Sequence, residues 1–212
     1  MSLDGDIKQV SALSPADRSR VAALLVVRYC GFHGDPHFSP WFETHRDALA
    51  KVRELAVDIC RQALPGVAEV TREALEVVRE LLDEVIEGSD PDGPPFETEV
   101  VDHLVFATEV LDFLLSPQET GALSYAFERA LELAEARREM GEEDYPDNAW
   151  EPVDFEALEA AARHADIGEL LAAEQEGILD PAPMPARSEE FARRYADVIA
   201  HCYTDEEAGQ QG

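Results

Sequence analysis

Basic residues are scarce in this chain. It has 17 lysines and arginines against 46 aspartates and glutamates, which gives a formal net charge of −29 at pH 7 over 212 residues. Proteins that bind nucleic acid or an anionic membrane need a basic surface that displaces counterions. The composition therefore predicts that neither nucleic acid nor a membrane is a partner.

Long hydrophobic runs and paired cysteines are also lacking. No apolar run approaches the roughly 20 residues that cross a bilayer, and residues 1–10 lack the apolar centre of a secretory signal. Cys30, Cys60 and Cys202 are far apart, odd in number and without a CxxC motif. This usage is typical of buried thiols in a reducing compartment. We therefore expect a cytoplasmic protein.

The chain likewise lacks the alternating pattern of β-strands, and its apolar residues recur at helical spacing. The pattern predicts an all-α fold in which residues 1–212 form a single-domain bundle of about seven helices. Five of them fall within residues 14–140, and two within residues 153–205 pack on the same core. The predicted ranges are 15–30, 41–64, 67–87, 97–115, 116–140, 154–177 and 188–205.

Two of these helices are apolar on almost every side. Val21 to Val27 are seven apolar residues in a row, and residues 97–115 are nearly as apolar. A helix without a polar face is usually buried on all sides, so we expect these two to be the central buried helices. In the second of them Asp102 should be buried, and it would need a partner such as Arg28.

Helix boundaries carry several signals. Ser14, followed by Pro15 and with Asp17 three positions on, predicts the start of the first helix. Ser116 and Glu119 predict a second capped start in the same way. Residues 178–187 contain three prolines and are expected to form a linker, and Gly168 is expected to kink the helix that contains it.

Histidines and carboxylates gather in residues 33–47. Another histidine, His103, follows Glu99 by one helical turn. Imidazole and carboxylate groups are common ligands of Zn²⁺ and Fe²⁺. One interpretation is a metal site, and its candidate ligands are His33, His37, His45 and His103. The alternative is a loop of hydrogen-bonding side chains and a core histidine at His45, because the spacing matches no established ligand motif.

Motifs for catalysis are absent from the sequence. It contains no Gly-x-Ser-x-Gly, no glycine-rich phosphate loop and no Glu-x-x-His. Cys30 lies at the predicted C-terminal end of a helix, where the helix dipole raises rather than lowers a thiol pKa. These absences favour a protein that is not an enzyme and that holds no cofactor.

An acidic segment with two aromatic residues is a candidate interaction site. Its residues are Glu142, Glu143, Asp144, Tyr145 and Trp150. Tyrosine and tryptophan often anchor protein interfaces, and the carboxylates would attract a basic partner. The alternative is a solvated loop whose aromatic side chains lie on the bundle.

The order of elements in residues 14–140 resembles the YjaG-type family of uncharacterised bacterial all-helical proteins. The resemblance rests on Arg28-Tyr29 at the end of the first helix, on the segment Val101 to Ala107 in a central helix, and on Met140 at the end of the fifth. It implies an all-α bacterial protein of unknown function, and it transfers no functional residues.

Three functions remain open from the sequence. The first is an interaction protein whose acidic surface binds a basic protein partner or which forms a homodimer. The second is a metal-binding protein or metal-dependent enzyme that uses the cluster of His33, His37 and His45. The third is an immunity protein, or an inhibitor that binds a basic toxin or nuclease. We rank the interaction protein first.

Overall fold

The computed structural model describes residues 3–36, 38, 42–62, 69–90, 92–144, 153–177 and 182–209, and for residues 141–144 and 201–209 the backbone alone. Within these ranges the chain forms eight helices and no strand. They are α1 (Leu3–Val10), α2 (Pro15–Tyr29), α3 (Glu43–Arg61), α4 (Arg72–Gly88), α5 (Pro95–Leu115), α6 (Thr120–Asp144), α7 (Phe155–Glu176) and α8 (Pro183–Gly209). The all-α prediction is confirmed, and the helix number is close to the predicted seven.

Short polar side chains begin several of these helices. Ser14 precedes α2, and its side chain accepts a hydrogen bond from the backbone N–H of Asp17 at 3.2 Å, as the sequence predicts. Thr71 caps α4 and Asp154 caps α7 by the same type of bond. Each cap satisfies a backbone donor that the first turn of a helix leaves without a partner.

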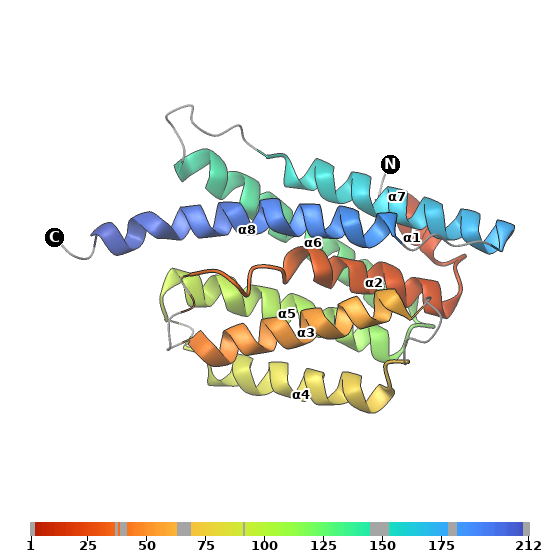
Figure 1. The fold of residues 1–212 in the computed structure, drawn as a ribbon, viewed down its shortest axis with the longest axis horizontal. Coiled ribbons are helices and arrows are strands. Elements are labelled where there is room, and N and C mark those ends of the chain that lie inside the picture. The colour runs from red at the N-terminus through yellow and green to blue at the C-terminus, as the bar shows by residue number, and fades with distance from the viewer. Residues whose placement is uncertain are drawn as a thin grey trace.

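Two helices form the centre of the bundle, as predicted. Residues 21–30, which include most of α2, are all buried, and α2 contacts α3, α5, α6, α7 and α8. The second central helix, α5, contacts α2, α3, α4 and α6. Figure 1 shows α3 and α4 on one side of this centre and α7 and α8 on the other. The two peripheral helix pairs therefore present separate surfaces.

The loop after α2 approaches α8 closely. A Cβ atom placed on Gly31 would lie 2.8 Å from the Cβ of Ala192. Any side chain at this position would force the loop away from α8. Gly31 is therefore needed for the way in which the end of α2 passes the last helix.

One helix and several helix boundaries differ from those expected. α1 was not predicted, although it buries Asp6 and Val10 against the bundle. Ser116 ends α5 instead of starting α6, which begins at Thr120 after a turn closed by the bond from Glu119 N to Ser116 O. The expected linker, residues 178–187, also contains the start of α8 at Pro183. Proline is tolerated in the first turn of a helix, because the backbone N–H that it lacks would have no hydrogen-bond partner there.

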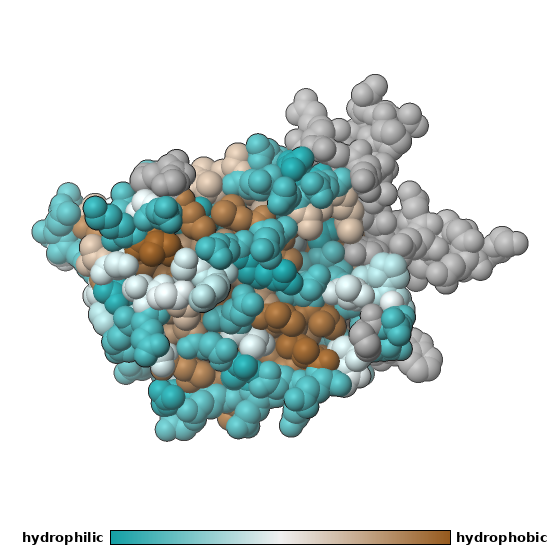
Figure 2. Space-filling model, turned by 180° about the vertical axis from the view of Figure 1, so that it is seen from behind, coloured by the Kyte–Doolittle hydropathy of each residue, from teal (hydrophilic) through white to brown (hydrophobic). Residues whose placement is uncertain are grey.

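The face opposite to that of Figure 1 is mostly hydrophilic, and its apolar side chains gather in separate areas (Figure 2). None of the helices in the described ranges combines the length and the hydropathy that crossing a bilayer requires. α7 continues through Gly168 as one helix, so the kink expected at this residue does not interrupt it.

Candidate functional site

His45 lies at one end of the α3–α4 pair and faces inward, as its place on the apolar stripe of α3 predicts. Its Nε2 atom is 2.9 Å from Ser89 Oγ and 3.6 Å from Glu97 Oε1. Burial lowers the pKa of this imidazole, and the nearby Glu97 carboxylate opposes that effect. Serine and carboxylate contact the same ring nitrogen, whereas a catalytic triad needs them on opposite nitrogens. The cluster therefore joins α3, α4 and α5 without forming a proton relay.

His103 occupies the core between α5 and α8. Its Nδ1 atom is 2.7 Å from the backbone oxygen of Glu99, and its Nε2 atom is 2.8 Å from the hydroxyl of Tyr195. Burial lowers the pKa of His103 and raises that of Tyr195. Because both ring nitrogens have protein partners, neither is free to coordinate a metal in this arrangement. Arg137 also binds Glu99 and lies 5.0 Å from the Tyr195 ring centre, which completes this buried cluster.

The other predicted metal ligands do not join these two histidines in the described part of the chain. His33 lines a shallow depression on the outer side of α3, beside Asp47, Lys51 and Arg53. His37 lies outside the described residues. Within the described ranges, no group of three or more histidine, cysteine, aspartate or glutamate side chains is arranged to hold a metal ion. His33, His45 and His103 each have different neighbours.

The acidic segment expected to bind a partner falls largely outside the description. Glu142, Glu143 and Asp144 belong to the last turn of α6, so this helix extends beyond the predicted end at residue 140. Their side chains, together with Tyr145 and Trp150, lie outside the described part. The proposed role of these five residues therefore stays a prediction.

Asp102 is not the buried partner of Arg28, contrary to expectation. Its side chain is half exposed and accepts a hydrogen bond from Arg129 of α6 at 3.1 Å. Arg28 instead binds Asp166, and its Nη1 atom lies 3.5 Å from Glu159 Oε1. Both carboxylates belong to α7. The sequence analysis predicted a buried Asp102 with a partner such as Arg28, and the structure instead pairs Arg28 with carboxylates of α7.

Arg28 belongs to a buried ionic network that joins α1, α2, α7 and α8. Arg163 is 3.0 Å from Asp6 and 2.5 Å from Glu159, and Arg187 is 2.6 Å from Asp166 and 2.8 Å from Glu169. Burial raises the pKa of Glu159 and of Asp166, although the neighbouring arginines oppose this effect. Removing one member would leave the opposite charge buried without a partner. The network therefore fixes α7 and α8 on the rest of the bundle.

A groove of about 500 Å³ runs between α3 and α4. Leu55, Val70, Ala74, Val77 and Val78 form its apolar part. Val77 is 64% exposed. The charged lining consists of four carboxylates and one ammonium group, namely Glu54, Asp58, Glu69, Glu73 and Lys51. The groove is thus apolar inside and net negative at its borders.

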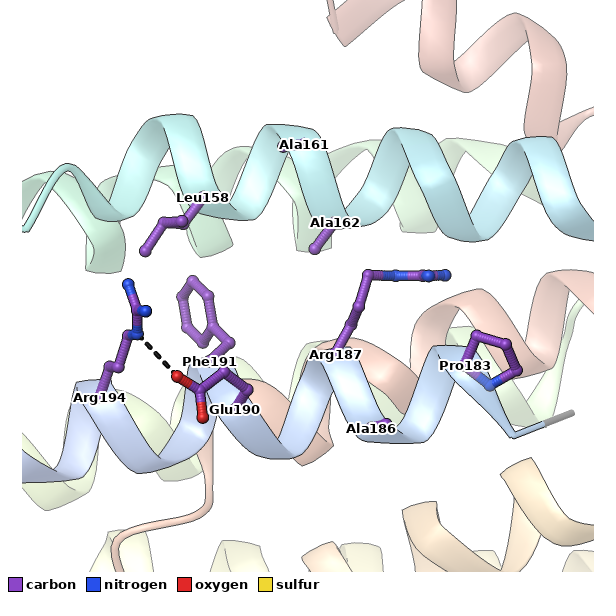
Figure 3. A pocket seen from close by; sticks show the side chains of 9 residues that line it. All are labelled: Leu158, Ala161, Ala162, Pro183, Ala186, Arg187, Glu190, Phe191 and Arg194. Atoms are coloured by element: carbon purple, nitrogen blue, oxygen red, sulfur yellow. Dashed lines mark hydrogen bonds and ion pairs between the residues drawn. The ribbon is translucent and has the colours of Figure 1, made fainter.

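A second groove, of about 560 Å³, lies between α7 and α8. Figure 3 shows Leu158 and Phe191 facing each other across it, with Arg187 and Arg194 projecting from α8 toward α7. Glu190 binds Arg194 at 2.9 Å on the same helix. The rest of the lining is Ala161, Ala162, Pro183 and Ala186. The borders of this groove therefore carry charges of both signs.

Both grooves and the ionic network were not predicted from the sequence. The apolar positions of α4 gave one usable signal, because they cover a wider sector than one neighbouring helix can bury. The outer edge of that sector is Val77. The ionic network gave no such signal, since its members are spread over four helices that are distant in the sequence.

Comparison with protein-family models, with curated proteins and with solved structures finds no match to this chain. The resemblance to the YjaG-type family therefore stays a prediction. The α3–α4 groove is the better candidate for a foreign partner, because it combines an uncovered apolar side chain with charge of mainly one sign.

Proposed function

We propose that this protein is a non-enzymatic interaction protein, and that its α3–α4 groove binds a basic amphipathic helix of a protein partner. The observation that carries the proposal is the exposed Val77 inside an acidic border. Helix-in-groove recognition uses an apolar groove to receive the apolar face of a partner helix. The polar border then selects the partner by charge.

The apolar part of the groove provides the affinity in this proposal. Leu55 and Val78 are buried within the bundle and form the floor, whereas Val77 projects into solvent. A partner side chain that covered Val77 would remove apolar surface from water on both molecules. Such burial contributes roughly 25 cal/mol per Å². An exposed valine of this kind is otherwise rare here, since Tyr125 is the other large hydrophobic side chain found exposed in the described ranges.

The charged border provides the selectivity. Asp58 from α3 and Glu69 and Glu73 beside the start of α4 lie around the apolar floor, and Lys51 is the cation among them. Lys51 is itself paired with Glu54 at 3.1 Å. A helix with lysine or arginine beside its apolar face would place cations against these carboxylates. A basic toxin or nuclease is one partner of this charge class.

The groove offers little for acid–base catalysis. Its described lining contains no histidine and no cysteine. His45 and His103, which have perturbed pKa values, lie elsewhere and contact side chains of the fold. These placements support a binding role for the groove.

A fluorescent peptide tests the proposal. The probe is an amphipathic helix of about 18 leucine and lysine residues, long enough for five turns, and its binding is followed by anisotropy. Two control peptides accompany it, one with glutamate in place of lysine and one with the same composition but a scrambled order. We expect the basic amphipathic peptide to bind, and both controls to bind at least about tenfold more weakly, which corresponds to about 1.4 kcal/mol.

Matched variants locate the binding site. Val77→Asn removes the apolar contact, and Tyr125→Asn makes a similar change at the other exposed hydrophobic residue. Asp58→Lys reverses a border charge, and Glu84→Lys makes the same reversal on an exposed part of α4 outside the groove. We expect Val77→Asn and Asp58→Lys to weaken binding while their controls leave it nearly unchanged. Equal effects of Asp58→Lys and Glu84→Lys, or equal binding of the scrambled peptide, would contradict the proposal.

A further inference from the structure

The outer face of α7 differs from other outer faces of this acidic protein. Ala157, Ala161, Gly168 and Ala172 are all exposed on α7, and His164 is the larger side chain among them. The outer face of α4 instead presents a row of carboxylates, namely Glu73, Glu76, Glu80, Glu84 and Glu87. In a chain with a net charge of −29, a neutral outer face next to an apolar groove is a surface on which two negatively charged molecules can approach each other.

The charges on α8 are balanced where they border the groove. Pro183 to Ala200 contain three acidic and three basic residues, so that 3 − 3 gives a net charge of zero for this stretch. Glu190 and Arg194 both line the groove and are separated by one helical turn. This pair is self-complementary, because an antiparallel copy of the helix would place its Arg194 near Glu190 and its Glu190 near Arg194.

The groove is also held open by buried structure. Phe191 packs against Tyr29, Phe155 and Tyr195, with ring centres 5.1 to 5.8 Å apart. Arg187 is held by Asp166 and Glu169 of the ionic network. Walls fixed in this way do not have to be ordered on binding, which reduces the entropic cost of association.

We propose that two copies of this chain associate through the α7–α8 groove as a two-fold symmetric dimer. In a two-fold interface the same surface is used by both subunits, so the surface must complement itself. The groove meets this requirement with its apolar centre and its Glu190–Arg194 pair. Alanine and glycine on α7 permit close approach of helices, and two helix pairs that meet in this way form a four-helix arrangement.

Charge repulsion explains why this face is used for self-association. Two molecules of the same net charge repel each other, and the acidic outer face of α4 would add a local repulsion between copies. The outer face of α7 and the balanced charges of α8 add little. The dimer also leaves the α3–α4 groove free, because Figure 1 shows the two helix pairs on opposite sides of the molecule.

Analytical ultracentrifugation of the full chain tests the dimer. From about 10 to 500 µM, the range for weak to moderate association, we expect the mass to rise from that of the 23.4 kDa chain toward twice this value. Ala161→Glu and, independently, Ala186→Glu place a new carboxylate in the groove of both copies and should give a monomer. Val77→Glu places the same charge in the other groove and should leave the dimer intact.

Charge exchange provides a second test that does not depend on apolar contact. Glu190→Arg alone and Arg194→Glu alone should each weaken the dimer at least about fivefold, which corresponds to about 1 kcal/mol, whereas the double exchange should restore it. A monomer at every concentration would overturn the proposal. So would a dimer that persists in both Ala161→Glu and Ala186→Glu, or one that Val77→Glu dissociates. None of these results depends on whether the α3–α4 groove binds a basic helix.

Discussion

The α3–α4 groove and the α7–α8 groove have similar volumes but differ in the charges at their borders. The α3–α4 groove is bordered mainly by carboxylates, and both of its helices contact the central helix α5. The α7–α8 groove carries charges of both signs, and one of its arginines belongs to a buried ionic network. In the two proposals, a foreign basic partner and a second copy of the chain are distinguished by the charges at the borders of a similar apolar centre. We also expect mutations near the α3–α4 pair and near the α7–α8 pair to change the stability of the protein by different amounts.

The largest expected effect is at the ionic network. Arg28→Met leaves Glu159 and Asp166 buried without one of their cations, and this type of change typically costs about 3 to 5 kcal/mol. We expect a loss of this size in the free energy of unfolding, measured by urea denaturation. Lys51→Met, at the other groove, removes an exposed pair with Glu54 and should cost less than about 1 kcal/mol. Similar losses in the two variants would refute the distinction between the two sides.

A smaller effect is expected where α8 is bound to the core. Tyr195→Phe removes the hydroxyl that lies 2.8 Å from His103 Nε2, and leaving a buried polar group without its partner costs about 1 to 3 kcal/mol. Tyr125→Phe removes an exposed hydroxyl and should change stability by less than about 0.5 kcal/mol. Thermal unfolding of both variants measures the difference. A Tyr195→Phe protein as stable as Tyr125→Phe would show that this bond does not hold α8.

The pH dependence of stability should also differ between the two sides. Burial lowers the pKa of His103 below the ordinary 6.5, so the unfolded chain binds a proton more readily than the folded protein. The stability that the neutral His103 ring contributes to the folded protein is therefore fully present above pH 6.5, and it is lost as the pH falls below this value. His103→Gln is neutral at every pH, so its stability deficit relative to wild type should narrow from pH 7.5 to 5.5, by at most about 1.4 kcal/mol per pH unit.

His45 provides the corresponding measurement beside the α3–α4 pair. Its pKa is also lowered by burial, but the Glu97 carboxylate opposes the effect. His45→Gln should show the same direction of narrowing, with a smaller slope because the His45 ring is partly exposed whereas the His103 ring is fully buried. A deficit that widens as the pH falls, in either variant, would contradict the stated direction of the pKa shift.

The smallest expected effect concerns two buried thiols. Burial raises the pKa of both Cys30 and Cys60 to about 12, so each should react with a thiol reagent only after local opening. Cys60 belongs to α3, whereas Cys30 lies at the end of α2 beside α8. In a Cys202→Ser background we expect Cys60 to be modified before Cys30, as mass spectrometry of time points would show. The reverse order would indicate that the α8 side opens more readily.

Much of the fold follows from local sequence, because its signals are local. The apolar run from Val21 to Val27 identified a central helix, and Ser14 with Pro15 identified its start. The bond between Arg28 and Asp166 was not predictable in this way, since every buried arginine has many possible carboxylate partners in a chain with 46 acids. Pro183 shows the same limit, because proline is compatible with both a linker and a first helical turn.

The candidate site was less predictable than the fold. The histidine and acidic side chains indicated a metal site in the sequence because they are common metal ligands. In the structure His45 and His103 instead contact hydroxyl groups of the bundle, those of Ser89 and Tyr195. The grooves depend on how pairs of helices lie against each other, and no single segment encodes that relation. The wide apolar sector of α4 indicated that part of it would stay uncovered, but the identity of the uncovered residue, Val77, followed only from the positions of α3 and α5.

The ionic network has a consequence for the order in which the chain folds. Asp6 and Arg28 meet their partners on α7 across separations of 157 and 138 residues. During synthesis, the first two helices therefore leave the ribosome long before the charges that neutralise them exist. Contacts of such long range form late and slow the folding of small domains. The N-terminal half of this protein should accordingly reach its final state only after α7 has been made.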